Sequence, residues 1–351
     1  MVVLAIVLVA TQVKKEPKEI KIGAVLPLTG PAATLGEWIK QGYQLAVSDI
    51  NAAGGINGEK IKLIIEDGMG DPKTSVSAFR KLVEIENVKI VLGVVSSVCL
   101  ALKPLADESK ILFFADVGHP QITGDSKYVF RHSQTADQEA TVISQFIVGD
   151  KNLKKGLVIV GSDDYGISFL NKATDNFKNA NVKIENITFE VGTKDFKTIT
   201  QKAIKYAPQF VILGGGDPKG IGLLVKKLRE YNYKSLIITT MAFTFPDALK
   251  SAGSAGRGVY FTDFVVHYED TLYNVVNGAY EKIYKRKIPP ITLFEYNSVR
   301  LISRSIQKVG YNPDKISGYL LEMVTYNGVG EKITITPKGD LSPEMIIRKY
   351  E

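Results

Sequence analysis

Residues 21–58 read KIGAVLPLTGPAATLGEWIKQGYQLAVSDINAAGGING, and their apolar pattern changes across two prolines and a glycine. The first residues form a continuous apolar run, whereas from about Leu35 apolar residues recur every three or four positions as far as Gly54-Gly55. This change of period predicts a buried strand, a loop and a long helix in succession. The first N–H groups of a helix have no partners within it and lie at the positive end of its dipole. We therefore expect an anionic group or ordered water at the mouth of this helix.

The same succession of strand and helix continues along most of the chain. Strand-like segments lie at 20–26, 60–66, 89–94 and 111–115, and again at 156–161, 182–190, 209–215 and 235–240. These segments are dense in Ile, Val and Leu on both faces, which is typical of parallel strands covered by helices. The chain is therefore predicted to be an α/β protein with two doubly wound, Rossmann-like units in tandem.

The pattern changes near Gly258, where one more strand is followed by two helices, the second from about Leu293 to Val309. These helices need a sheet to cover, and the second unit is already covered, so we expect the chain to return to the first unit. A last strand around 345–348 would take it back to the second, making three crossings. The predicted domains are a signal-peptide remnant or disordered extension at 1–18, lobe I at 19–135 plus 265–340, and lobe II at 136–264 plus 341–351.

The composition excludes several classes of function. The 351 residues carry 44 basic and 37 acidic side chains. The basic ones are scattered in short pairs rather than clustered, so we expect no nucleic-acid partner. Cys99 is the only cysteine, so neither an intrachain disulfide nor a cysteine-based metal site can form. Residues 1–13 form an apolar run that is too short to span a bilayer and is typical of a secretory signal. An extracytoplasmic or periplasmic location follows, with a frayed N-terminal extension as the alternative.

The sequence carries none of the common enzyme motifs. The stretch GGGDPKG at 214–220 lacks the spacing of a nucleotide-binding loop, and a proline at a helix start explains it more simply. No GxSxG motif occurs, and the three histidines lack the spacing of metal ligands. We therefore expect a protein that is not an enzyme and needs no metal or cofactor.

A family resemblance rests on motifs spread over the whole mature chain. The opening IGAVLPLTGPAATLGEWIKQGYQLAVSDINAAGGINGEKIKLIIEDGMGDPKTSV resembles the start of the branched-chain amino-acid (Leu/Ile/Val) type of periplasmic binding protein, the substrate-binding component of an ABC importer. The likeness continues through YVFRHSQTADQEA, SDDYGISF and GRGVYF to ITPKGDL. It implies a type I periplasmic binding protein fold, in which two lobes joined by a three-strand hinge close like a Venus flytrap on a ligand. It also implies a signal peptide, a small carboxylate ligand, permease and ATPase partners, and a monomer.

The resemblance also assigns ligand contacts position by position. In lobe I they fall at Leu35, Trp38, Ser96, Ser97, Val117, Gly118 and His119. In lobe II they fall at Tyr165, Gly216, Asp217, Met241 and Phe243. The family's serine at the position of Ser97 helps to hold the ligand carboxylate, and its acidic residue at the position of Met241 takes the ligand ammonium.

Two of these positions depart from the family's pattern. Met241 would leave a ligand ammonium without its usual counter-charge, although Asp217 or Asp116 could substitute. His119 replaces a neutral hydroxyl with a group that can donate hydrogen bonds and carry positive charge. Both changes favour an amine-free organic or aromatic acid over an amino acid such as leucine, and both ligand classes stay open. The expected function is capture of a small carboxylate for import; the alternative is a ligand-sensing regulator of the same fold without a transport role.

Overall fold

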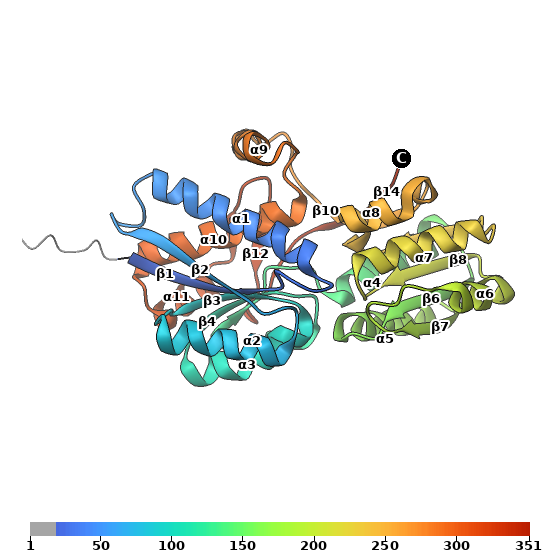
Figure 1. The fold of residues 1–351 in the computed structure, drawn as a ribbon, viewed down its shortest axis with the longest axis horizontal. Helices are drawn as coiled ribbons and strands as arrows, with labels where there is room; N and C mark the ends of the chain where they lie inside the picture. The colour runs from blue at the N-terminus through green and yellow to red at the C-terminus, as the bar shows by residue number, and fades with distance from the viewer. Residues whose placement is uncertain (1–18) are drawn as a thin grey trace, which may run out of the picture.

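The computed structural model describes residues 19–351, and it shows two α/β lobes side by side (Figure 1). Residues 1–18, which the sequence assigns to a signal-peptide remnant or extension, lie outside the described residues. Each lobe is built on its own sheet, so the prediction of two doubly wound units is confirmed.

Lobe I contains a parallel sheet with the strand order β2-β1-β3-β4-β5. Its strands are β1 (Glu19–Leu26), β2 (Lys60–Asp67), β3 (Ile90–Val94), β4 (Leu112–Asp116) and β5 (Val129–Phe130). Alternate residues face opposite sides: Ile22 and Ala24 belong to the core on one face of the sheet, whereas Val25 belongs to the core on the other. Both faces are therefore buried, as the continuous apolar runs predicted.

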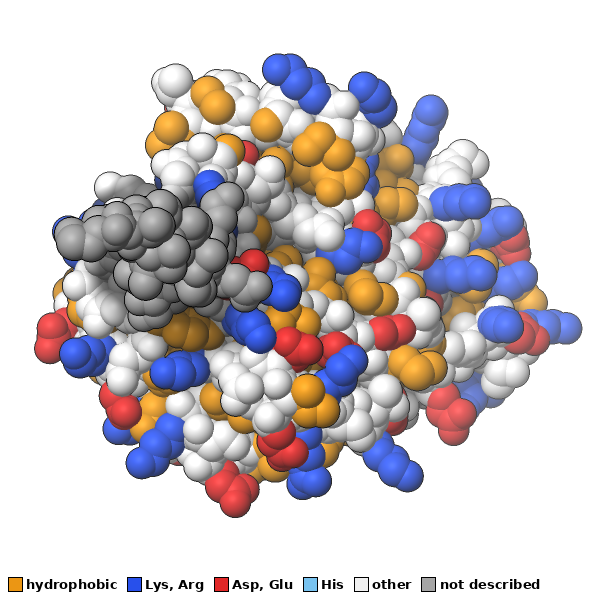
Figure 2. Space-filling model, turned by 60° about the vertical axis from the view of Figure 1, so that its left-hand side comes forward, with side chains coloured by type: hydrophobic (Ala, Val, Ile, Leu, Met, Phe, Trp, Pro, Cys, Tyr) orange, Lys and Arg blue, Asp and Glu red, His pale blue; other side chains and the backbone are white. Residues whose placement is uncertain are grey.

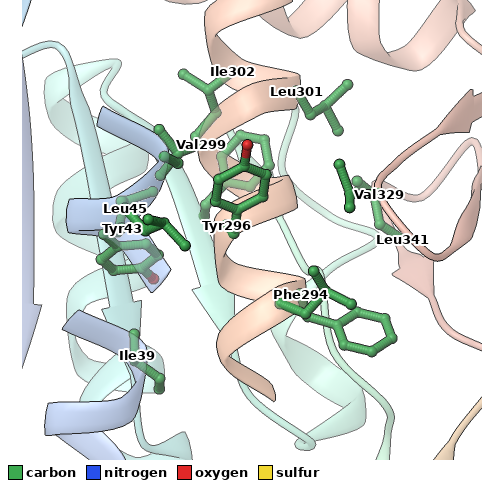
Figure 3. Packing of buried hydrophobic residues seen from close by; sticks show 14 of the residues in the cluster. Ile39, Tyr43, Leu45, Phe294, Tyr296, Val299, Leu301, Ile302, Val329 and Leu341 are labelled. Atoms are coloured by element: carbon green, nitrogen blue, oxygen red, sulfur yellow. The ribbon is translucent and has the colours of Figure 1, made fainter. Parts of the chain in front are cut away.

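Helices cover both faces of this sheet (Figure 1). The helices of lobe I are α1 (Ala33–Ala52), α2 (Pro72–Arg80), α3 (Ser96–Ser109), α9 (Thr271–Tyr284), α10 (Pro290–Val309) and α11 (Pro313–Glu322), of which α9 lies outside the layer of α1 and α10. The α1 and α10 helices lie side by side, with Ile39 and Tyr43 on α1 facing the helix that carries Tyr296 and Val299 (Figure 3). The chain thus returns to lobe I after β10, as predicted.

Lobe II contains a six-stranded sheet with the order β14-β10-β9-β8-β6-β7. Its strands are β6 (Lys155–Gly161), β7 (Lys183–Phe189), β8 (Phe210–Gly214), β9 (Leu236–Thr239), β10 (Tyr260–Phe264) and β14 (Met345–Lys349). Neighbouring strands are parallel except β14, which pairs antiparallel with β10. The helices are α4 (Ala136–Gln145), α5 (Asp164–Asn179), α6 (Lys197–Tyr206), α7 (Pro218–Glu230) and α8 (Pro246–Ala252).

Several elements are absent from the sequence-based expectation. They are α4, α8, α11, the short strand β5 and a small antiparallel sheet of β11 (Thr325–Asn327), β12 (Lys332–Ile335) and β13 (Leu341–Ser342). Strands of two to four residues are too short to show a period. The α4 helix does carry a signal, because Thr135 and Gln138 form a capping box at its start.

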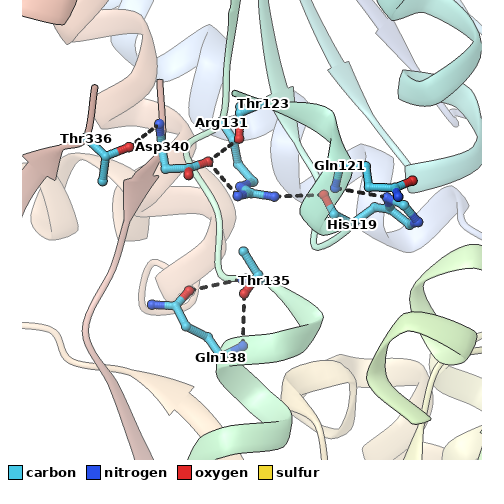
Figure 4. A network of polar contacts seen from close by, with 8 residues as sticks. All are labelled: His119, Gln121, Thr123, Arg131, Thr135, Gln138, Thr336 and Asp340. Atoms are coloured by element: carbon cyan, nitrogen blue, oxygen red, sulfur yellow. Dashed lines mark hydrogen bonds and ion pairs between the residues drawn. The ribbon is translucent and has the colours of Figure 1, made fainter. Parts of the chain in front are cut away.

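The chain crosses between the lobes three times, and the crossing segments hydrogen-bond to one another. The Arg131 N–H donates to the Gly339 carbonyl oxygen at 2.9 Å, and the Leu341 N–H donates to the Arg131 carbonyl oxygen at 2.6 Å. The buried Arg131 side chain also pairs with Asp340 (Figure 4). The segment after β10 joins them, since the Val265 N–H donates to the Glu344 carbonyl oxygen. The boundaries at 135, 264 and 340 stay predictions.

Within residues 19–351, no helix has both the length and the apolar composition needed to cross a membrane.

The crossing of α1 and α10 depends on Gly42, because an added Cβ there would overlap the Thr292 carbonyl oxygen. We expect Gly42→Ala to lower the free energy of unfolding by about 1–3 kcal/mol, since the backbone of α10 would have to move. Gly278→Ala in α9 is the matched control, because no atom lies within 4 Å of that added Cβ. It should stabilise the helix by up to about 1 kcal/mol. Midpoints of denaturant unfolding measure the stability of both variants relative to the parent. Equal stability of the two variants would contradict the packing argument.

Candidate functional site

A cavity of about 410 Å³ lies between the two lobes. It is lined from lobe I by the segments that follow β1, β2, β3 and β4, and from lobe II by the segments that follow β6, β7, β8 and β9. The carboxyl ends of parallel strands are where open α/β sheets bind ligands. The tandem topology therefore brings two such edges to one space.

Nine of the twelve predicted site residues line this cavity. They are Leu35, Ser96, Ser97, Val117, Gly118, Tyr165, Gly216, Asp217 and Met241. Asp116, considered as an alternative acid, also lines it. The sequence reasoning missed Ser133 and Gln134, which reach the cavity from the first crossing segment. No periodic pattern marks these two residues, because their position depends on how the lobes meet.

Trp38 and Phe243 lie behind the cavity rather than in it. The Trp38 ring stacks on Phe245, with ring centroids 4.7 Å apart, and Phe245 is the side chain that reaches the cavity. Phe243 is fully buried in the core of lobe II against Phe261 and Tyr350. Both aromatic residues thus support the walls of the site.

His119 also lies outside the cavity, and its own local structure explains why. It caps the short turn at Pro120–Ile122, with its Nδ1 accepting from the Gln121 N–H at 3.3 Å (Figure 4). Its carbonyl oxygen accepts from Arg131 Nη1 at 2.7 Å. Partial burial lowers the pKa of the imidazole, which favours its neutral form. The structure therefore places no His119 contact in the cavity.

The helix N-termini facing the cavity differ between the lobes. In lobe I, α1 begins after Ala32 and α3 begins after Val95, and neither cap supplies a side-chain acceptor. In lobe II, Asp163 caps α5 by accepting from the Gly166 N–H, and Asp217 caps α7 by accepting from the Gly220 N–H. Of these four helix ends, only the two on lobe I keep N–H groups that no side chain caps, at the positive end of the dipole. On lobe II, the shorter helix α8 begins after the cavity-lining Phe245 and also has no side-chain cap.

The cap of α3 has an unusual backbone. Val95 has a φ of 75°, a left-handed conformation that is rare for a β-branched residue. Backbone strain of this kind is held by the surrounding structure and concentrates at functional sites. Here it turns the chain so that Ser96 and Ser97 start the helix at the cavity wall.

The two lobes touch at Gly118 and Tyr165. An added Cβ at Gly118 would overlap the ring of Tyr165, so only glycine lets this ring reach across from lobe II. The Tyr165 hydroxyl is buried and has no hydrogen-bond partner among the described residues. A ligand group could satisfy this hydroxyl, because buried polar groups normally have partners.

The charged side chains that line the cavity are all aspartates. They are Asp116, Asp163, Asp164 and Asp217, with no Lys, Arg or His among the described lining residues. Asp163 also accepts from the Gly216 N–H, and Asp217 also accepts from the Gly192 N–H at 3.2 Å. These two carboxylates are engaged by the backbone and Asp164 is exposed to solvent, so Asp116 is the aspartate that remains to meet a charged ligand group.

Asp116 forms a carboxyl pair with Glu295 of α10. Burial, followed by the neighbouring Asp116, raises the pKa of Glu295 well above its ordinary value, and burial also raises the pKa of Asp116. Two carboxyl groups in contact at low dielectric cannot both ionise readily, so they titrate as a unit that retains a proton. Behind this pair lies another buried acid, Glu331, whose carboxyl oxygen is 3.2 Å from the imidazole Nε2 of His132.

A second buried acid, Glu139 of α4, supports the wall of lobe II. One of its carboxyl oxygens accepts from the Met241 N–H at 3.0 Å and from the Thr262 hydroxyl. The other oxygen is buried without a partner among the described residues. Burial raises the pKa of Glu139 to about 7. Glu139 thus joins the start of lobe II to the segment that carries Met241.

Among residues 19–351, no group of His, Cys, Asp and Glu side chains is arranged to hold a metal ion.

Comparisons with known proteins agree with this architecture. The sequence pattern of the periplasmic binding protein family matches residues 19–349. The Leu/Ile/Val-binding protein BraC3 of Rhizobium johnstonii is 30% identical over 305 residues, which cover 84% of this chain and 81% of that protein.

Two solved structures share the fold. The leucine-binding protein LivK of Thermotoga maritima superimposes with a TM-score of 0.88 at 20% identity, covering 95% of both chains. A solute-binding protein of an ABC transporter from Rhodopseudomonas palustris, in complex with 3,4-dihydroxybenzoic acid, has a TM-score of 0.85 at 22% identity. It covers 95% of this chain and 93% of its own.

The raised pKa of Glu139 predicts a pH-dependent stability. Unfolding returns the carboxyl to its ordinary pKa of roughly 4.3, so between about pH 4 and pH 7 the folded protein holds more protons than the unfolded one. The contribution of Glu139 to stability is therefore present at the acid end and lost as the pH rises through 7. The loss is on the order of 3 kcal/mol.

Glu139→Gln should remove this dependence, because the amide does not ionise and can still accept from Met241 and Thr262. The measurement is the difference in unfolding free energy between variant and parent at pH 5 and pH 8, with the exposed Glu108→Gln as the control. A difference that stays constant over this range would show that Glu139 does not titrate there.

Proposed function

Since the chain belongs to the periplasmic binding protein family, we propose that it is the extracytoplasmic substrate-binding component of an ABC importer. Members of this family bind solutes and are not enzymes. The relatives and structural neighbours are named as amino-acid or solute-binding proteins, some from ABC transporters, which supports the transport function over the regulatory alternative. The observation that carries the proposal is one ligand-sized cavity lined by both lobes.

The ligand carboxylate is proposed to bind on lobe I. The N-terminus of α3 offers the hydroxyls of Ser96 and Ser97 together with backbone N–H groups that no side chain caps. The corresponding termini of lobe II are already neutralised by Asp163 and Asp217. An anionic group therefore gains more on lobe I than on lobe II.

The same ligand is proposed to carry an ammonium group held by Asp116. The preference for an amine-free acid rested on His119 as a donor and on Met241 replacing an acid. His119 does not line the cavity, and every charged side chain that does is an aspartate. Enclosing a purely anionic ligand beside Asp116 would bury like charges together, whereas an ammonium compensates them. With Leu35, Val117 and Met241 as apolar walls, a small apolar amino acid fits this chemistry best.

The permease and the ATPase of the importer are the proposed partners. We also propose that the protein is a monomer and that an N-terminal signal directs its secretion.

Calorimetric titration with leucine and its 2-keto acid tests the ligand class. We expect leucine, or another apolar amino acid from a panel, to bind at least tenfold more tightly than its keto acid. Asp116→Asn should weaken amino-acid binding by roughly ten- to a hundredfold, or about 1.4–2.7 kcal/mol, because one buried ionic contact is lost. Binding of the keto acid should not weaken.

Asp164→Asn is the matched control, since Asp164 lines the same cavity but is exposed. Tight binding of the keto acid or of benzoate with no response to any amino acid would refute the ammonium proposal. It would leave the binding function itself intact.

The contact between Gly118 and Tyr165 allows a test of closure. With ligand, the radius of gyration from solution scattering should decrease, because the lobes close on it. Gly118→Ala should weaken ligand binding and reduce this contraction, since the added methyl group displaces the Tyr165 ring. Gly149→Ala, where no atom lies within 4 Å of the added Cβ, should behave as the parent. A full contraction in Gly118→Ala would show that this contact does not limit closure.

A further inference from the structure

The α9 helix of lobe I exposes an apolar stripe. Leu272, Val275 and Ile283 are 56%, 65% and 61% exposed, and Tyr268, just before the helix, is 47% exposed. With the half-buried Ala279 between them, the helical residues are spaced by three, four and four positions, so they lie along one side of the helix. Four of the eleven large exposed apolar side chains of the described chain thus fall within 16 residues.

The stripe is exposed although the helix is firmly held. The neighbouring side of α9 buries Tyr273, Val276 and Tyr280 in the core of lobe I. The Tyr280 hydroxyl donates to Gln41 of α1, and Asp270 caps the first turn by accepting from the Leu272 N–H. Figure 1 shows α9 outside the layer of α1 and α10, at the edge of the molecule. The stripe is therefore a fixed, protruding feature of the surface.

Basic side chains adjoin the stripe at its C-terminal end. Lys282, Lys285 and Lys287 are exposed, and none of them forms an ion pair within residues 19–351. In Figure 2, apolar side chains gather below protruding Lys and Arg side chains at the upper edge, the side on which Figure 1 places α9. The whole chain carries a net charge of +7. The C-terminal end of the stripe thus combines apolar contact with an excess of positive charge, since the three lysines outnumber the neighbouring Glu281, whereas Glu269 and Asp270 lie beside its N-terminal end.

The size and charge of the stripe decide between two partners. A second copy of this chain would bring the same excess of lysines and the same net charge. Three side chains on one helix also offer far less than the roughly 800 Å² per partner that a stable interface buries. An anionic lipid surface needs no such area, because apolar side chains enter the headgroup region while lysines attract the lipid charge.

We propose that α9 is an interfacial helix that places Leu272, Val275 and Ile283 in an anionic lipid surface, with Lys282, Lys285 and Lys287 at the headgroups. Such contact would hold lobe I at a membrane while the cavity between the lobes stays free to bind ligand. The proposal does not depend on which ligand the cavity takes.

A fluorescent label on α9 tests this proposal locally. Cys99 is the only native cysteine and is fully buried, so a Val275→Cys variant of the full chain can be labelled with an environment-sensitive fluorophore at one site. With vesicles of phosphatidylcholine and phosphatidylglycerol, we expect the emission to strengthen and to shift to shorter wavelength. Pure phosphatidylcholine vesicles should give a smaller shift, and high salt should reduce the shift on anionic vesicles.

Two controls separate α9 from the rest of the chain. The same label at the exposed Asn179→Cys on lobe II should not respond to vesicles. Adding Leu272→Ser and Ile283→Ser to the Val275→Cys protein should abolish its response without changing ligand titrations, which report the proposed function separately.

Several results would overturn the proposal. They are an unchanged label on anionic vesicles, an equal response at Asn179→Cys, and a response that survives the double serine substitution. A shift that appears without lipid and grows with protein concentration would also overturn it, in favour of pairing between two copies of this chain.

Discussion

The main-chain pairing of the crossing segments is the constraint on which the site depends. Arg131 of the first crossing exchanges backbone hydrogen bonds with Gly339 and Leu341 of the third, and its buried guanidinium pairs with Asp340. The same guanidinium donates to the carbonyl oxygen of His119, at the end of the loop that carries Val117 and Gly118. The Arg131 side chain thus contacts both the joint between the lobes and the loop that forms one wall of the cavity. Removing this guanidinium would leave a buried carboxylate and a carbonyl oxygen without their donor, which is costly at low dielectric.

The polarity of the cavity depends on which of the helix N-termini around it are capped by side chains. In lobe II, Asp163 and Asp217 cap α5 and α7, whereas α1 and α3 of lobe I have no side-chain caps. Lobe I also holds the Asp116–Glu295 carboxyl pair near these mouths. A positive dipole end and an acid therefore lie on the same lobe, which suits a ligand carrying charges of both signs. Lobe II contributes the Tyr165 hydroxyl and three aspartates, of which Asp163 and Asp217 accept from backbone N–H groups and Asp164 is exposed.

The sequence was sufficient for the tandem lobes, because strands that are apolar on both faces alternate with amphipathic helices. It also predicted the return of α10 to lobe I, since a helix with an apolar face needs a sheet to cover. It did not reveal β5 or the small sheet of β11–β13, whose strands are too short to show a period. Comparison with the family's ligand contacts, position by position, predicted that Ser97, Tyr165 and His119 line the cavity. Ser97 and Tyr165 do, whereas His119 lies outside it. The turn at Pro120–Ile122 takes that imidazole as its cap, an effect that depends on backbone geometry rather than on residue spacing.

With the proposed closure of the lobes, the difference between the capped and uncapped helix ends would also set an order of binding events. The anionic group of a ligand would first meet the uncapped ends of α1 and α3 on lobe I, and the association rate would then reflect that half-site. On the proposed closure, lobe II would add its contacts after the first encounter, and these contacts would mainly slow release. Residence time and capture rate would then depend on different lobes. Substitutions could therefore adjust one of these rates with little effect on the other.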